Sequence, residues 1–119
     1  MNMKRLNKKI IKILEEQGFK VHDVEKHDNK YYVEINQHTP AGEDWWESIM
    51  FNGTNKDFIE QICKRTISFD IDDETEVFIR NRGKNGVPNS ITTLVDDAKW
   101  KMETLEIVCN NLNKIRKEV

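Results

Sequence analysis

Five acidic residues lie within seven positions near the middle of the chain: Asp70, Asp72, Asp73, Glu74 and Glu76. Carboxylates at this density could bind a divalent cation, occupy a basic groove of another protein, or take the place of nucleic-acid phosphates. The spacing lacks the central glycine and terminal glutamate of an EF-hand loop, which argues against calcium. A plain solvent-exposed loop is the simplest alternative. Three further acidic residues could extend the cluster: Glu43, Asp44 and Glu47.

Large apolar side chains could anchor a partner beside these carboxylates. Trp100 and Ile107 are seven residues apart in a predicted helix, on a face that points away from its main apolar stripe. They are either covered by the N-terminal helix or exposed to a partner or a second copy. In the predicted sheet, Trp46 and Phe78 alternate with core residues and fall on the second face. That face is either covered by helices or free to dock a partner.

Other residue types that often carry chemistry are not arranged as a known site. His22, His27 and His38 do not have the spacing of a metal set. The glycine-rich segment 83–90 lacks the Lys-Ser/Thr pair of a phosphate loop, so a turn followed by a helix cap is favoured over an anion site. Cys63 and Cys109 are expected to be buried free thiols of a reducing compartment. We therefore expect a non-enzymatic protein with no metal and no cofactor.

The elements that position these residues follow from the periodicity of the apolar side chains. The pattern predicts a helix over about 3–17, an extended segment from Phe19, a strand around 31–36, and a strand over 44–51. A helix over about 55–67, a strand over 75–80 and a long helix from about 90 to 117 follow. The order α-β-β-β-α-β-α predicts an α+β fold with three helices on a small antiparallel sheet of about four strands. The 119 residues predict one domain, 1–119.

Charge is unevenly distributed although the formal net charge is only −2. An acidic body is flanked by a basic N-terminal helix, with Lys4, Arg5, Lys8, Lys9 and Lys12, and by a basic C-terminal end. These basic residues could meet an anionic surface or simply solvate the fold. The small net charge disfavours a dedicated nucleic-acid binder. No apolar run is long enough to span a bilayer and no secretory signal is present, so we expect a cytoplasmic protein.

Two stretches carry a resemblance: Thr39-Pro-Ala-Gly-Glu-Asp44, and the segment from Phe69 to Ala98 with its Phe-Asp-Ile-Asp and Gly-Lys-Asn-Gly-Val-Pro-Asn-Ser-Ile motifs. They resemble small acidic proteins of phages, plasmids and integrated elements of Gram-positive bacteria. That resemblance implies a shared fold and, by association with anti-CRISPR proteins, inhibition of a host defence system. Its motifs are turns and caps, so no catalytic residue is implied.

The leading hypothesis is a non-enzymatic inhibitor of a host defence nuclease, most plausibly a CRISPR effector. The acidic cluster would occupy a basic groove of the nuclease while Trp46, Phe78 or Trp100 supplies the apolar anchor. A structural or regulatory homodimer, built on the second sheet face or on Trp100 and Ile107, is the second hypothesis. The third is a nucleic-acid-binding accessory protein that uses the N-terminal helix, Arg80, Arg82 and Lys84.

Overall fold

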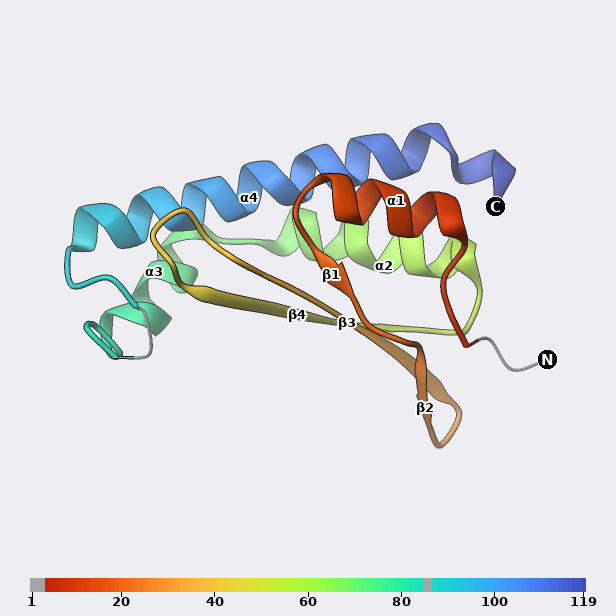
Figure 1. The fold of residues 1–119 in the computed structure, drawn as a ribbon, viewed down its shortest axis with the longest axis horizontal. Coiled ribbons are helices and arrows are strands. Elements are labelled where there is room, and N and C mark those ends of the chain that lie inside the picture. The colour runs from red at the N-terminus through yellow and green to blue at the C-terminus, as the bar shows by residue number, and fades with distance from the viewer. Residues whose placement is uncertain (1–3, 85–86) are drawn as a thin grey trace.

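The computed structural model describes residues 4–84 and 87–119, and shows an α+β fold (Figure 1). The described elements are α1 Lys8–Glu16, β1 Lys20–Val21, β2 Glu25–His27, β3 Lys30–His38, β4 Asp44–Phe51, α2 Asn55–Ser68, α3 Ile71–Ile79, α4 Ile91–Lys114 and a 3-10 turn Arg116–Glu118. The predicted fold class, a small four-stranded antiparallel sheet with a long C-terminal helix, is confirmed. No helix of the described residues is long and apolar enough to cross a membrane.

Strand β3 lies inside the sheet and pairs antiparallel with β4 on one side and with β1 and β2 on the other. The β3–β4 register runs from Tyr31 opposite Phe51 to His38 opposite Asp44. Side chains of β4 alternate strictly between buried and exposed, as expected of a sheet with one covered face.

Helices α1, α2 and α4 lie on the same side of this sheet (Figure 1). Together with the inner face of the sheet they enclose a core that includes Ile10, Leu14, Phe58 and Leu105, all 0% exposed. In the part of the chain that the structure describes, the opposite face of the sheet is open, and Trp46 and Met50 on it are 48% and 46% exposed. Of the two alternatives for the second sheet face, the uncovered one is therefore observed.

The N-terminal helix packs against the body of the protein. The Asn7 side chain accepts a hydrogen bond from the Lys9 backbone N–H, so the helix begins later than the predicted residue 3, which itself lies outside the described residues. Ile10, Ile11 and Leu14 of α1 are buried in the core. Helices α2 and α4 are capped in the same way, by the side chains of Thr54 and Ser90.

The predicted strand over 75–80 is wrong, because these residues belong to the helix α3. The Asp70 side chain accepts hydrogen bonds from the backbone N–H groups of Asp72 and Asp73, and three acidic residues occupy the first helical turn. Both features stabilise a helix N-terminus. The expected acidic loop is thus the start of a helix, and Val77 on this helix is 58% exposed.

The observed order is α-β-β-β-β-α-α-α, with four helices rather than three in the described residues. The sheet still has four strands because the single extended segment expected after Phe19 divides into β1 and β2. The predicted turn at 83–86 includes Asn85 and Gly86, which lie outside the described residues.

Candidate protein-binding surface

The acidic residues singled out in the sequence divide into buried and exposed groups. Glu43 is 1% exposed and Glu47 is 9% exposed, and Glu74 is half-buried. Each of the three carboxylates is bound by a basic side chain of this same chain. They therefore stabilise the fold and are not free to meet a partner.

Lys101 holds two of these carboxylates together. Its Nζ lies 2.8 Å from Glu43 Oε1 and 2.9 Å from Glu74 Oε1, and 4.1 Å from the centre of the Phe78 ring. Lys101 is itself 1% exposed. The ammonium of Lys101, a residue of α4, thus links Glu43, which precedes β4, to Glu74 of α3. This contact holds the inner side of α3 against α4.

Two further polar groups complete this buried network. Thr39 Oγ1 donates a hydrogen bond of 2.5 Å to Asp97 Oδ2 and accepts one from the Glu43 backbone N–H. Burial raises the pKa of Glu43, the nearby Lys101 ammonium lowers it, and the Asp97 carboxyl raises it again. Burial prevails, so the pKa of Glu43 stands above its ordinary value.

Arg65 of α2 binds the third carboxylate in a two-pronged contact. Its Nε and Nη2 lie 2.6 Å and 3.0 Å from the two oxygens of Glu47, which also accepts a hydrogen bond from the Trp45 indole at 2.9 Å. This fork geometry is the strongest that arginine forms with a carboxylate. Glu47 thus links the inner face of β4 to α2.

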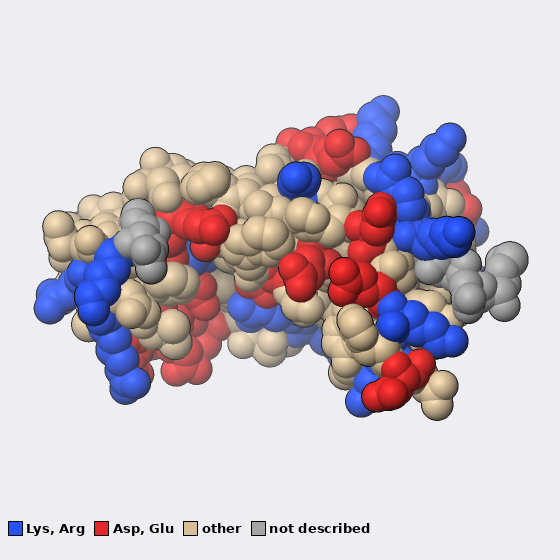
Figure 2. Space-filling view, turned by 60° about the horizontal axis from the view of Figure 1, so that its bottom comes forward, with Lys and Arg blue, Asp and Glu red and all other residues tan. Residues whose placement is uncertain are grey.

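The exposed carboxylates that remain lie mostly on one side of α3. Asp72, Asp73 and Glu76 are exposed, and with the exposed Val77 they form what we call the acidic face of α3. A shallow hollow of about 480 Å³ is lined by Asp73, Glu76, Val77, Arg80 and Asn81. Figure 2 shows acidic side chains toward the left end of the molecule, where Figure 1 places α3, with basic side chains beside them at the tip.

No protein-family model matches this chain. Searches of curated proteins and of solved structures also find no significant match.

The predicted apolar anchors fall in different environments. Trp46 lies on the open sheet face, where its ring stacks on the His22 ring with the ring centres 5.2 Å apart. Its indole N–H donates a hydrogen bond to Asp44 Oδ2, with the nitrogen 3.0 Å from the oxygen. Phe78 is half-buried under Lys101. Trp100 is half-buried and packs edge-on against Trp45, whereas Ile107 is 45% exposed. Trp100 and Ile107 therefore do not form one exposed pair.

Sequence reasoning missed Lys101, although a signal was present. Lys101 falls on the main apolar stripe of the last helix, three residues after Ala98 and four before Leu105. A charged residue at a position that the helical period assigns to the core predicts a buried ionic partner. Asp97, four residues before it, falls on the same side and is 3% exposed.

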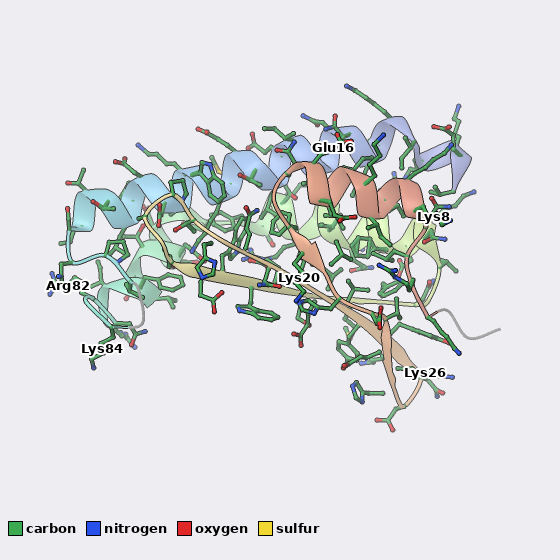
Figure 3. All side chains as sticks on the ribbon, in the orientation of Figure 1. Lys8, Glu16, Lys20, Lys26, Arg82 and Lys84 are labelled. Carbon is green, nitrogen blue, oxygen red and sulfur yellow. The ribbon has the colours of Figure 1, made fainter. Side chains whose placement is uncertain are left out.

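The basic residues considered for nucleic-acid binding are split between the two ends of the molecule. Figure 3 places Lys8 at the opposite end from Arg82 and Lys84. Several members of the N-terminal group are paired within the chain: Arg5 with Asp23, Lys9 with Glu118 and Lys12 with Glu16. The residues named for nucleic-acid binding thus do not form one continuous surface. Among the described residues, no group of three metal-ligating side chains is placed to hold a metal ion.

The two cysteines, distant in the sequence, meet between α2 and α4. The Asn113 side chain contacts both thiols, with its oxygen 4.0 Å from Cys63 Sγ and its amide nitrogen 3.6 Å from Cys109 Sγ. Burial, and then the neighbouring Cys109, raise the pKa of Cys63 to about 12. Cys63 therefore carries almost no thiolate near neutral pH.

We expect Cys63 to resist alkylation in the folded protein. The thiolate is the reactive form, so iodoacetamide at about pH 8 should modify Cys63 at least about tenfold more slowly than a free cysteine. Peptide mass spectrometry over time measures this rate. The same reaction in denaturant is the control, and equal rates in the folded and denatured protein would contradict the raised pKa.

Proposed function

We propose that this protein is a non-enzymatic inhibitor that binds a basic surface of another protein, and that its target is a host defence nuclease of the CRISPR effector type. The acidic face of α3 is the contact surface in this proposal. The nature of the target rests on the resemblance to small proteins of phages and mobile elements. The contact surface rests on the geometry of α3.

One observation carries the choice of surface. Asp72, Asp73 and Glu76 remain exposed on α3 beside the apolar Val77, whereas Glu43, Glu47 and Glu74 are paired with Lys101 or Arg65 of the same chain. Exposed carboxylates around an apolar side chain suit a basic groove, because the charges speed and orient the encounter and the apolar group holds the complex.

The rear of α3 supports the same reading. Lys101 binds Glu74 and covers Phe78, so the helix is fixed to α4 before any partner arrives. A surface fixed in advance loses less conformational entropy on binding than a flexible acidic loop. The acidic face of α3 is therefore better suited to tight binding than the loop that the sequence suggested.

Charge reversal on α3 tests the proposal. We expect the wild-type chain to reduce DNA cleavage by at least one member of a panel of purified CRISPR nucleases from Gram-positive bacteria. Replacing Asp73→Lys and Glu76→Lys together should raise the concentration needed for inhibition at least about tenfold. The inhibition should also weaken as salt is raised, because exposed charges are screened.

A matched variant separates the surface from the net charge. Glu103→Lys with Glu106→Lys changes the charge equally, at exposed positions of α4. This variant should inhibit as the wild type does. Thermal unfolding checks that both variants are folded. Equal inhibition by the α3 variant and the wild type would contradict α3 as the contact surface. A lack of inhibition of every nuclease in the panel would contradict CRISPR effectors as the target class.

A further inference from the structure

Strand β4 forms an edge of the sheet. Among the described residues β4 pairs with β3 alone, and α2, the helix in extended contact with it, covers its inner face. The other side of the sheet ends in β1 and β2, which span only Lys20–Val21 and Glu25–His27. Short, charged edge strands of that kind resist pairing with another chain. β4 has eight residues and no lysine, proline or glycine.

The register shows which backbone groups of β4 point outward. The His22 N–H donates to the Glu34 carbonyl at 3.0 Å, so Glu34 and the residues two positions away in β3 direct their backbone groups toward β1 and β2. The alternate residues of β3 bond to β4, where their partners include Glu47, Ile49 and Phe51. The intervening residues Trp46, Ser48 and Met50 must then direct N–H and C=O toward the free edge.

These outward backbone groups have no partner in the part of the chain that the structure describes. Neither the backbone–backbone bonds nor the side-chain bonds involve the N–H or C=O of Trp46, Ser48 or Met50. The side chains of the same residues are exposed on the open sheet face. An extended strand satisfies such a row of alternating donors and acceptors, because its own groups repeat with the same period.

We infer that β4 pairs antiparallel with β4 of a second copy of this chain, about a two-fold axis at Ser48. In this register Ser48 lies opposite Ser48 of the second copy, and Trp46 of each copy lies opposite Met50 of the other. Each of these pairs can exchange both of its backbone hydrogen bonds, because all of the residues involved direct their groups outward. The sheets of the two copies then join into one.

Side-chain complementarity selects this register. It places the two exposed apolar residues, Trp46 and Met50, against each other on the open face, where a sulfur–aromatic contact adds to the pairing. Asp44 falls opposite the neutral Asn52, and Glu47 opposite Ile49. A two-fold axis at Glu47 would instead place Glu47 opposite Glu47 of the second copy, and two like charges directly opposite each other destabilise strand pairing. A symmetric contact of this kind closes on itself and does not propagate.

The molar mass of the full chain in solution tests the pairing. Sedimentation equilibrium from micromolar to millimolar protein should show a reversible monomer–dimer equilibrium. Ser48→Pro removes one outward N–H, and proline is tolerated there in the monomer because the residue lies on an edge. It should raise the dimer dissociation constant at least about tenfold, whereas Ser48→Ala, which keeps the N–H, should not.

Cross-linking through the axis residue tests the register itself and does not depend on the proline variant folding. Ser48→Cys should form a covalent dimer when a mild thiol oxidant such as diamide is added, because directly opposed residues lie within disulfide range. Glu34→Cys, on the same face but on β3, should not. A monomer at every concentration, a dimer unaffected by Ser48→Pro, or no cross-link from Ser48→Cys would each overturn the inference. Because α3 is not involved, this result is independent of the inhibition assay.

Discussion

Replacing Lys101→Met is expected to lower the free energy of unfolding by about 3–5 kcal/mol. The ammonium of Lys101 is 1% exposed and binds Glu43 and Glu74, so its removal leaves two carboxylates without their cation. Methionine has nearly the same length and keeps the packing on Phe78. The loss therefore reflects the unpaired charges and not a cavity.

Denaturant unfolding measures this effect, and a neighbouring lysine provides the control. Lys99→Met changes the same residue type in the same helix, but Lys99 is exposed. It should alter the stability by no more than about 0.5 kcal/mol. Adding Glu43→Gln to Lys101→Met should restore part of the loss, because one of the unpaired charges is then removed. Equal effects of the two lysine substitutions would contradict the buried ion pairs.

The pH dependence of the Lys101→Met effect has a definite sign. The pKa of Glu43 is already raised by burial, and removing Lys101 takes away a cause that lowers it. A carboxyl whose pKa is raised on folding binds more protons in the native state, so its contribution to stability falls as pH rises through that pKa. The Lys101→Met loss should therefore be smaller at about pH 5 than at about pH 8.

Replacing Phe58→Ala is expected to cost about 3–5 kcal/mol, by a different mechanism. Phe58 is fully buried on α2 and meets the Phe51 ring edge-on at 5.6 Å, so it joins the helix layer to β4. Alanine leaves a cavity between the two layers that the surrounding side chains fill only in part. Urea unfolding followed by circular dichroism measures the loss.

Ile67 on the same helix supplies the matched control for Phe58. Its side chain is 84% exposed, so Ile67→Ala removes a large apolar side chain without opening a cavity. We expect a change within about 0.5 kcal/mol. Comparable losses at the two positions would show that helix propensity, and not core packing, sets the stability of α2.

The fold class followed from the sequence because its strongest signals were local. The strand predicted over 44–51 and the helices predicted to begin near residues 55 and 90 agree with β4, α2 and α4. Residues 75–80 were wrongly predicted because β-branched and aromatic side chains favour a strand. The Asp70 cap and the packing of α3 on α4 outweigh that preference.

The candidate surface was predictable only in part. The number of acidic residues can be read from the sequence, but which of them form ion pairs in the folded protein cannot. Glu43, Glu47 and Asp73 look alike as residue types. The structure buries the first two against Lys101 and Arg65 and leaves Asp73 exposed. Which acidic residue finds a partner depends on contacts across 58 and 18 positions of the chain, as for Glu43 with Lys101 and Glu47 with Arg65. No local pattern records them.

The buried network also bears on how the protein emerges during synthesis. Thr39 bonds to Asp97 and Glu43 bonds to Lys101, each across 58 positions of the chain. Because both contacts close the same loop, whichever forms first bears most of the entropic cost of loop closure, and the second forms at little further cost. Until α4 has left the ribosome, the carboxylate of Glu43 lacks its ionic partner Lys101, and the inner face of the sheet has only α1 and α2 as apolar cover. Strands β3 and β4 and helix α2 are synthesised first, yet they reach their native packing only when the last third of the chain has been synthesised.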